Sequence, residues 1–399
     1  MTTDAVRCAA DGESTPDDEW TDWKWQQRNA IRTAGQFRTR FPGCDQEILD
    51  RITRHNFSKR FQVTPYYLSL VATDPTTGGP ALDDPLWKQV APQRFGGDGG
   101  DEPYAYDGKT ENWELPHEMV TPIAQHKYDN RVILRYANVC HAYCQFCYEA
   151  LRTLDKDSAK ASFDRDHWRA TLDYLHAHPQ VEEIILSGGE PLMHANGQID
   201  QVLGEVSAAR PDLLVRFHTR ALTFNPYRID DELAAILARH GVVSIGLHVT
   251  HPRELTPEFD VAVKRLQAGV PIIFANVPLL GGVNDSPETM RELCMGLYRR
   301  GVHAGYLYHF MPHSPESECF RIPVQRGVEI MRSLKRRISN PAVPEYVLPH
   351  ATGKYTVPLV DVGSTDGLPR HVLDDEGFRV LEMVNWQGDH VRYPDPEVV

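Results

Sequence analysis

The chain has 399 residues, of which 41% are hydrophobic, and a formal net charge of -13 at pH 7. This length is enough for one large domain with extensions or for two modest ones, each with a buried core. The acidic balance argues against a nucleic acid partner, because a phosphate backbone requires clusters of Lys and Arg. The seven cysteines lack paired spacing and no long apolar run is present, so we expect a cytoplasmic protein without a membrane segment.

The first third of the chain has three segments of different composition. Residues 1–18 are small and polar and are predicted to be disordered. From Trp20 three tryptophans and helical spacing follow, which predicts helices within 20–70. Residues 74–118 are dense in Gly, Pro and Asp, which indicates a long irregular connection. We therefore expect residues 19–118 to form a helical N-terminal extension with a loop that wraps around the core.

From residue 131 onward, β-rich runs alternate with amphipathic stretches. This pattern predicts an α/β fold with parallel strands and helices outside them, either a partial (β/α)6 barrel or an open doubly wound sheet. In both folds ligands bind at the carboxyl ends of the strands. We expect the core to span 119–325 and a C-terminal segment to span 326–399. The predicted strands are 131–136, 181–186, 213–218, 242–248, 271–277 and 303–310.

Three cysteines follow the first predicted strand, with the spacing C-x3-C-x2-C: Cys140, Cys144 and Cys147. A four-iron cluster normally takes four ligands, so three thiolates would leave one iron open to bind a small molecule. The alternatives are three free cysteines, or a zinc site to which His141 adds the fourth ligand of a tetrahedron. The cysteine loop therefore predicts chemistry at a cluster, at the carboxyl end of the sheet.

The second predicted strand ends in Ser187, Gly188, Gly189 and Glu190. Two glycines let the backbone approach a ligand closely, and the carboxylate offers a hydrogen-bond acceptor. Alone, this pattern is also typical of a tight turn between a strand and a helix. One strand after the cysteine loop, it indicates a cluster that faces a site for an amino group.

Together the two motifs resemble the radical S-adenosylmethionine superfamily across residues 131–310. The resemblance implies a partial barrel of the radical SAM type, with the three cysteines as ligands of a [4Fe-4S] cluster. It also implies that S-adenosyl-L-methionine binds at the open iron, with its amino group held by Glu190. The other residues that would line this cofactor site are Ser187, Gly188, Gly189, Arg220, His248 and Asn276.

A narrower resemblance, to the lysine 2,3-aminomutases, extends from about Trp20 to Pro396 through stretches such as LSGGEPL, HTRALTFNPYRI, PLLGGVND and TGKYTVPLV. It implies an isomerase that moves an amino group from C2 to C3 of an amino acid. We also expect a small-molecule substrate and an electron donor such as flavodoxin or ferredoxin, and a homo-oligomer is possible.

The same resemblance implies pyridoxal 5'-phosphate as a further cofactor. Lys354, in ATGKYTVPL, would hold it as a Schiff base, since an amine forms an imine with the pyridoxal aldehyde. Lys127, Tyr128 and Arg131 stand where the family has RYxxR, whose basic residues reach the pyridoxal phosphate. Lys127 replaces the first arginine, which keeps the charge but loses the bidentate fork.

Three further positions depart from the family, and these three concern the substrate. Met311 and Val347 stand where lysine 2,3-aminomutases have the aspartates that grip the distal ammonium. Glu149 stands where the family has the arginine for the substrate carboxylate, and Arg152, one helical turn later, could replace that arginine. The substrate is therefore L-lysine or another amino acid.

Two other interpretations remain open. One is a tailoring enzyme with the same cofactors, such as a dehydratase or deaminase, that acts on an amino-acid-derived metabolite. The other is a cluster-bearing binding or sensor protein without turnover.

Overall fold

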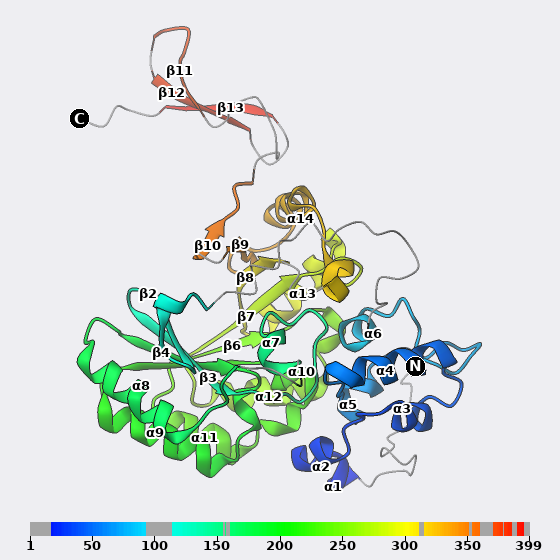
Figure 1. Ribbon diagram of the computed structural model, residues 1–399. Helices are drawn as coiled ribbons and strands as arrows, with labels where there is room; N and C mark the ends of the chain where they lie inside the picture. Colours follow the sequence, from blue (N-terminus) through cyan, green and yellow to red (C-terminus); the bar gives the residue numbers. More distant parts are fainter. Residues whose placement is uncertain are drawn as a thin grey trace.

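The computed structural model describes residues 17–92, 114–154, 156, 160–310, 315–350, 353–359, 370–377, 379–384 and 389–394. Its main body is a ten-stranded sheet in which the order of the strands is their order in the chain, β1 to β10 (Figure 1). These strands are β1 (Met119–Thr121), β2 (Ala124–Tyr128), β3 (Arg131–Ala137), β4 (Glu183–Gly188), β5 (Leu214–Thr219), β6 (Ser244–His248), β7 (Ile272–Leu279), β8 (His303–His309), β9 (Glu345–His350) and β10 (Gly353–Thr356).

The helices of the described residues fall into an N-terminal group and a group that alternates with the strands. The N-terminal group is α1 (Asp17–Trp20), α2 (Trp23–Arg28), α3 (Ala34–Arg40), α4 (Gln46–Ser58), α5 (Pro65–Ser69) and α6 (Pro85–Val90). The second group is α7 (Ala150–Thr153), α8 (Arg165–Ala177), α9 (Asn196–Ala209), α10 (Ala221–Phe224), α11 (Asp231–Arg239), α12 (Pro257–Gln267), α13 (Pro287–Arg299) and α14 (Val324–Arg337). Short 3-10 turns are η1 (Pro116–Glu118), η2 (Pro191–Met193), η3 (Pro226–Arg228), η4 (Pro252–Glu254), η5 (Pro315–Phe320) and η6 (Asn340–Ala342).

The topology of the large sheet decides between the two predicted architectures. Strands β3 to β9 are parallel, whereas β1, β2 and β10 pair antiparallel with their neighbours. A doubly wound sheet reverses its strand order at a switch point, and the sequential order seen here contains no reversal. No pairing between β1 and β10 closes the sheet within the described residues. The predicted α/β partial barrel is therefore confirmed.

The strand predictions agree with the structure except at the end of the sheet. All six predicted strands occur, as β3 to β8, with boundaries shifted by no more than two residues. A seventh parallel strand, β9, was not predicted, because its sequence EYVLPH contains a proline, which weakens a strand pattern. This strand matters because it pairs with β10, which carries Lys354.

The outer helices cover one face of the parallel strands and bury their apolar side chains (Figure 1). On β3, Val132, Leu134 and Tyr136 belong to this core, together with Trp168 of α8. Successive side chains of a strand point to opposite faces, so Arg131, Ile133 and Arg135 lie on the inner face of the sheet. The inner face is therefore the polar one, as a ligand site requires.

Side-chain caps fix where the outer helices begin. Asp164 accepts hydrogen bonds from two backbone N–H groups of α8, and Thr256 and Ser286 each accept one at the starts of α12 and α13. Short polar side chains at this position satisfy N–H groups that lack a partner in the helix. These caps place each helix start directly after the loop at the carboxyl end of the preceding strand.

The N-terminal helices form a second apolar core, which includes Phe37, Ile52 and Trp87. Ala142 of the cysteine loop and Phe224 of α10 belong to the same core. The extension therefore packs onto the carboxyl end of the barrel. Residues 1–16 of the segment predicted to be disordered lie outside the described residues, and α1 begins at Asp17.

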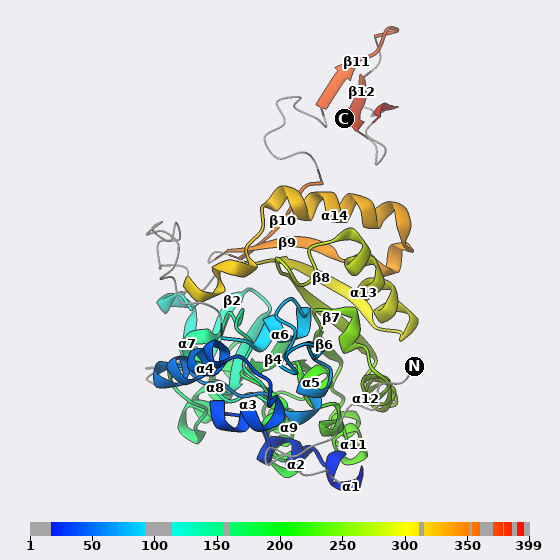
Figure 2. The same cartoon turned by 90° about the vertical axis from the view of Figure 1, so that its right-hand side faces the viewer.

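The C-terminal part of the chain first extends the barrel sheet and then forms a separate sheet. Helix α14 crosses the expected boundary at residue 325, and β9 and β10 extend the large sheet. A separate antiparallel sheet follows, which stands away from the main body in Figures 1 and 2. It consists of β11 (Arg370–Leu373), β12 (Arg379–Val384) and β13 (His390–Pro394).

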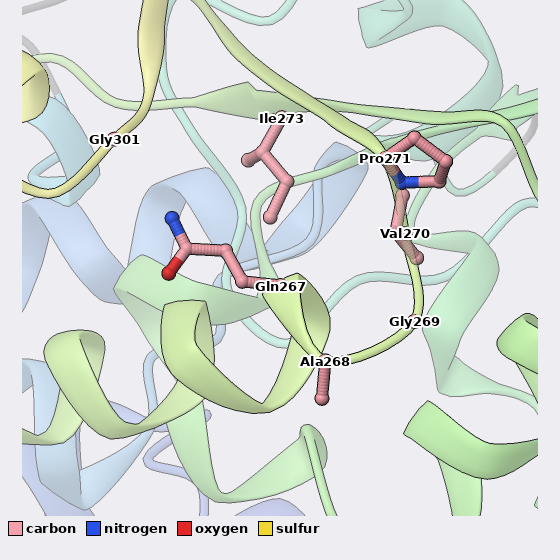
Figure 3. A pocket seen from close by; sticks show the side chains of 7 residues that line it. All are labelled: Gln267, Ala268, Gly269, Val270, Pro271, Ile273 and Gly301. Carbon is pink, nitrogen blue, oxygen red and sulfur yellow. The ribbon is translucent and has the colours of Figure 1, made fainter.

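One surface hollow lies at the opposite end of the strands from the cysteine loop, beside the start of β7 (Figure 3). Small and apolar residues such as Ala268, Val270 and Ile273 line it, and Gln267 adds an amide. None of its lining residues is titratable, and it lies away from the carboxyl ends where such folds bind ligands. It is not a candidate active site. Of the helices described, none has both the length and the apolar character needed to cross a bilayer.

Candidate functional site

The cysteine loop follows β3 directly, and the N-terminal extension holds its backbone. Tyr143 N–H donates to the carbonyl of Gln62 at 3.0 Å, and Gln145 N–H donates to the carbonyl of Gln89 at 2.9 Å. The Gln62 amide also donates to the carbonyl of Cys140 at 2.8 Å. Because these bonds come from two separate segments, the loop is fixed from outside the barrel.

The three thiols of the loop lie close enough to influence one another's charge. Burial raises the pKa of Cys140, and the neighbouring Cys147 and Cys144 raise it further. Burial likewise raises the pKa of Cys147 to about 12. Three thiolates this close would repel one another without bound metal, whereas a cluster would neutralise them. The donor set therefore fits an iron–sulfur cluster.

Zinc fits the loop less well than a cluster. Among the described residues, no three His, Cys, Asp or Glu side chains converge on a single ion position. A tetrahedral zinc needs that convergence, whereas a cubane distributes its thiolates over separate irons. The His141 Nδ1 lies 3.0 Å from the Gln27 amide oxygen, which gives that ring nitrogen a protein partner.

The two glycines at the end of β4, Gly188 and Gly189, allow the chain to pass against the cysteine loop. A Cβ on Gly188 would lie 2.6 Å from the carbonyl oxygen of Ala137, and one on Gly189 would lie 2.6 Å from that of Val139. Gly188 also has a φ of +102°, which strains any other residue. The glycine pair thus permits close packing of β4 against the segment that leads to Cys140.

Glu190 is buried and points toward neighbouring strand ends. Its carboxylate accepts hydrogen bonds from Thr219 Oγ1 at 2.7 Å, from Leu192 N–H at 3.0 Å and from Arg220 N–H at 2.8 Å. Carboxylate oxygens have about four lone-pair sites, so one more donor can be accepted. Glu190 also lies near enough to Cys140 to raise its pKa. The structure therefore brings the predicted amine acceptor beside the first cysteine.

Arg220 lies against the second cysteine. Its Nη1 is 3.0 Å from the Sγ of Cys144, and its Nη2 is 2.9 Å from an oxygen of buried Glu254. A buried guanidinium beside a thiolate stabilises the negative charge on sulfur. Arg220 thus contacts a proposed cluster ligand directly.

The inner face of β5 to β7 carries polar atoms without partners. Within the described residues, His218 Nε2, His248 Nε2 and Asn276 Oδ1 are buried and make no hydrogen bond. Desolvation lowers the pKa of His248 to about 4, with a smaller contribution from Arg220. Buried polar groups are normally paired, so three such atoms on neighbouring strands indicate a place for a polar ligand. This observation fits the resemblance-based assignment of His248 and Asn276.

Lys354 extends from β10 over a group of tyrosine rings. Its Nζ lies 4.6 Å from the ring centre of Tyr306, 5.6 Å from that of Tyr308 and 5.7 Å from that of Tyr128. Although the residue as a whole is exposed, desolvation of the ammonium lowers its pKa to about 8, and Arg131 contributes. A lysine with a lowered pKa is a better nucleophile near neutral pH.

Two guanidinium groups lie near Lys354. Arg131 stacks on the Tyr128 ring, with 4.0 Å between its Cζ and the ring centre. Arg216 of β5 pairs with Glu183 at 2.7 Å, and its Nε makes no hydrogen bond among the described residues. Lys127 instead forms an ion pair with Glu118 at 2.9 Å. The basic groups next to Lys354 are therefore Arg131 and Arg216.

Glu149 and Arg152 belong to a buried ion-pair network under the cysteine loop. Glu149 Oε1 lies 3.2 Å from Arg135 Nε, and its Oε2 lies 3.5 Å from Arg152 Nε. Arg152 also contacts Glu114 at 2.6 Å and the carbonyl of Ala161. The two guanidinium groups thus compensate the charge of Glu149.

The positions that bear on the distal end of the substrate are only partly described. Met311 lies outside the described residues. Val347 is buried in β9 opposite Tyr308. Glu318, a carboxylate in η5, pairs with Arg321 at 3.0 Å.

Sequence reasoning did not find Arg135, Arg216, His218, Tyr306 or Tyr308. Strand alternation could have found some of them, because Arg216 and His218 share a face of β5, and Tyr306 and Tyr308 share a face of β8. The importance of Arg135 depends on contacts with Glu149 and Glu114, which no sequence spacing reveals.

Comparisons with known proteins define the class first. A model of the Radical SAM superfamily matches residues 134–294, which run from β3 into α13. This match and the architecture identify a radical S-adenosylmethionine protein.

Relatives narrow the class to one family. The chain is 30% identical to the L-lysine 2,3-aminomutase of Clostridium subterminale over 95% of its own length and 85% of that protein. It is 29% identical to the L-lysine 2,3-aminomutase of Acetoanaerobium sticklandii (95% and 86%), and 26% identical to the glutamate 2,3-aminomutase of Clostridioides difficile (96% and 85%). The chain belongs to the lysine 2,3-aminomutase family. It is therefore an isomerase, and its family implies a [4Fe-4S] cluster, S-adenosylmethionine and pyridoxal phosphate.

Proposed function

We propose that the protein is a pyridoxal phosphate-dependent amino acid 2,3-aminomutase that moves an α-amino group to Cβ. The observation that carries the proposal is the environment of Lys354. Its amine lies over three tyrosine rings and beside two guanidinium groups, one of which belongs to Arg131, the first residue of the strand that leads to the cysteine loop. Desolvation, Arg131 and Arg216 make that amine neutral at a pH where an ordinary lysine is charged.

The residues that would bind the cofactors form two groups, one at each end of the inner face of the sheet. Cys140, Cys144 and Cys147 would hold the cluster, and Glu190 would accept a hydrogen bond from the amino group of S-adenosylmethionine. When bound, the cluster and S-adenosylmethionine supply a hydrogen-abstracting radical, and pyridoxal phosphate supplies the aldehyde that carries the migrating amino group. Arg220, next to Cys144, would stabilise the negative charge on a cluster ligand.

Lys354 and its neighbours would hold the pyridoxal phosphate. The neutral amine of Lys354 would hold the aldehyde of pyridoxal phosphate, and the cofactor would supply the carbonyl chemistry for the amino group of the substrate. Arg131 and Arg216 offer the charged donors that a phosphate group favours. Tyr306 and Tyr308 present ring faces toward Lys354, so the same rings would limit access of water to the attached cofactor.

The substrate class follows from what surrounds Lys354. A carboxylate at Val347 would pair with a distal ammonium, but the residue is apolar and buried. The nearby carboxylate of Glu183 is already paired with Arg216. These contacts favour an amino acid other than L-lysine, with L-lysine as the alternative.

A specific observation also favours a second candidate function. Glu149 occupies the position of a carboxylate-binding arginine in the family, and it is buried between two guanidinium groups. A substrate that presents no free carboxylate there would suit a tailoring enzyme, such as a dehydratase or deaminase, that acts on an amino-acid-derived metabolite.

The decisive experiment uses the protein reconstituted without oxygen with iron, sulfide, S-adenosylmethionine and pyridoxal phosphate. With dithionite as reductant and a pool of the common amino acids, we expect a β-amino acid of unchanged mass in mass spectrometry. A product of changed mass would favour the tailoring enzyme. Lys354→Ala should abolish both the product and the absorbance near 420 nm, whereas Lys264→Ala, on the exposed side of α12, should keep both. Retained turnover in Lys354→Ala would contradict the proposal.

A further inference from the structure

The ion-pair network under the cysteine loop contains two buried guanidinium nitrogens without a hydrogen-bond partner among the described residues, the Nη1 of Arg135 and the Nε of Arg152. Arg135 is only 2% exposed, and its Nε and Nη2 contact Glu149, Glu114 and Gln125. Its Nη1 is buried and has no partner among the described residues. An unpaired N–H on a buried guanidinium costs free energy, which a bound acceptor would recover.

The chemistry of the unpaired Arg135 donor favours an anion as that acceptor. In the described part of the network, Arg135 and Arg152 supply two buried positive charges, Glu114 and Glu149 supply two negative ones, and Lys160, whose side chain is 31% exposed, adds a positive charge at the edge. Hydrogen bonds from a guanidinium are strongest to a charged acceptor, so the Nη1 of Arg135 is suited to a ligand carboxylate.

The position of Arg135 places its unpaired donor on the inner face of the sheet, where the candidate active site lies. Arg135 lies on the inner face of β3, opposite Ser187 of β4. Tyr148 hydrogen-bonds with Ser187, and Tyr148 is also close enough to raise the pKa of Tyr308. Tyr308 in turn lies under Lys354. A series of neighbouring residues thus leads from Arg135 to the lysine, while Glu149 lies near Cys147.

Arg135 is also separate from the cations that surround Lys354. It follows Arg131 on the same face of β3 by four residues, which corresponds to about 13 Å along the strand. The inner face therefore offers two positive regions, Arg131 with Arg216 near Lys354, and Arg135 nearer the cysteine loop. A phosphorylated cofactor and an amino acid bring two anionic groups, one for each region.

We propose that Arg135 binds the α-carboxylate of the amino acid substrate through its unused Nη1. Glu149 and Glu114 position the guanidinium, and the inference rests on the proposed function. Arg152 is less suited, because its Nη1 and Nη2 already contact Ala161 and Glu114, and its unpaired Nε lies 3.5 Å from the Glu149 carboxylate, which would repel a ligand carboxylate there. Glu149 stands where the family has an arginine. Arg135 of β3 would thus take over the role of that arginine.

The test needs neither the cluster nor turnover. Protein loaded with pyridoxal phosphate is titrated with L-alanine and, separately, with L-alaninamide, which lacks the carboxylate. The change in absorbance near 420 nm gives the half-saturation concentration for each probe. In Arg135→Gln we expect the value for L-alanine to rise about 10- to 100-fold, because a charge-assisted hydrogen bond is lost, while the value for L-alaninamide stays within about twofold.

Two variants separate recognition from folding. Arg135→Lys keeps a positive charge beside Glu149 and Glu114 but cannot present the same fork, so we expect an intermediate loss for L-alanine. Arg152→Gln removes a guanidinium from the same network and should lower the melting temperature without changing the ratio of the two half-saturation values. Should Arg135→Gln fail to load the cofactor, Arg135→Lys provides the comparison.

The outcomes distinguish this inference from the proposed function. A ratio that is the same in wild type and in the loaded Arg135 variants would overturn the assignment of Arg135. A wild type without any 420 nm absorbance would overturn the proposed function and, with it, this inference. A wild type that responds to both probes but yields no β-amino acid leaves Arg135 in place as a carboxylate-binding residue and favours the tailoring enzyme.

Discussion

The two ends of the candidate site are built in different ways. The cysteine loop is fixed by hydrogen bonds from Gln62 and Gln89 of the N-terminal extension and by close contact with Gly188 and Gly189. Lys354 lies on β10, which is the last strand of the sheet and has β9 as its partner. The loop is enclosed on several sides, whereas the lysine strand is held on one.

The difference in enclosure matches the chemistry expected at each end of the site. A cluster requires its ligands in a fixed arrangement before metal binds, because a misplaced thiolate leaves an iron without a ligand. A lysine that is attached to a cofactor and then displaced by the substrate must move during each cycle. An edge strand with an exposed side chain allows that movement, and packed loops do not.

The largest effect is expected at the enclosed end. Cys144→Ser should abolish the cluster and all turnover, because the loss of one of only three thiolate ligands leaves a second iron of the cubane without a protein ligand. Iron and sulfide analysis after anaerobic reconstitution measures this directly. Cys319→Ser, at an exposed position outside the loop, should retain full iron content and serves as the control. Equal iron content in both variants would show that the loop is not the cluster site.

A smaller effect at the same end tests whether packing fixes the loop. Gly188→Ala places a methyl group 2.6 Å from the carbonyl oxygen of Ala137 and strains a φ of +102°. We expect a loss of about 1–3 kcal/mol in the free energy of unfolding, together with lower iron content.

Gly197→Ala is the matched control for that variant. A Cβ at Gly197 meets no atom within 4 Å, and the residue lies in α9, where alanine is favoured over glycine. Its stability should be equal or slightly higher, as chemical denaturation would show. A Gly188→Ala protein as stable as Gly197→Ala would contradict the packing argument.

The two ends also differ in how far the sequence predicts them. The strands β3 to β8 were predictable because local alternation and β-branched residues determine them, and the cysteine spacing marks its loop without any tertiary information. In contrast, β9 escaped prediction because Pro349 weakens its pattern, although that strand is what brings β10 and Lys354 to the sheet.

Contacts between segments could not be predicted from the sequence. The assignment of Lys127 to the cofactor phosphate stays a prediction, and the ion pair of Lys127 with Glu118 depends on how η1 and β2 pack. In the sequence, nothing distinguishes Arg135 from other strand residues. Its role depends on ion pairs with Glu114 and Glu149, which lie 21 and 14 residues away along the chain. Ion pairs between residues this far apart in the chain produce no periodic pattern in a sequence.

At the lysine end, the pH dependence of cofactor capture is the next test. The neutral amine attacks the aldehyde, so the rate should rise with pH and level off above about 8, the pKa of Lys354. An ordinary lysine would continue to gain rate up to its usual pKa near 10.5. Stopped-flow absorbance near 420 nm measures this profile.

Arg216→Gln sharpens that test. It removes a cation that disfavours the ammonium and also frees Glu183, which favours it, so the pKa of Lys354 should rise. Capture at pH 8 should then slow by roughly two- to fivefold, because less of the amine is neutral. A profile that does not move would mean that Arg216 is too distant to influence the lysine.

The smallest effect has the opposite sign. The Tyr306 ring lies 4.6 Å from Lys354 Nζ and stabilises the ammonium by a cation–π contact, worth about 0.5–1 kcal/mol at such a site. Tyr306→Leu should therefore lower the pKa of Lys354 by a few tenths of a unit, roughly, and shift the capture profile to lower pH. Tyr298→Leu, on the exposed side of α13, is the control and should leave the profile unchanged. Opposite shifts in Arg216→Gln and Tyr306→Leu would show that charges and rings act on the same amine, whereas shifts of one sign would mean that both variants only alter its exposure to water.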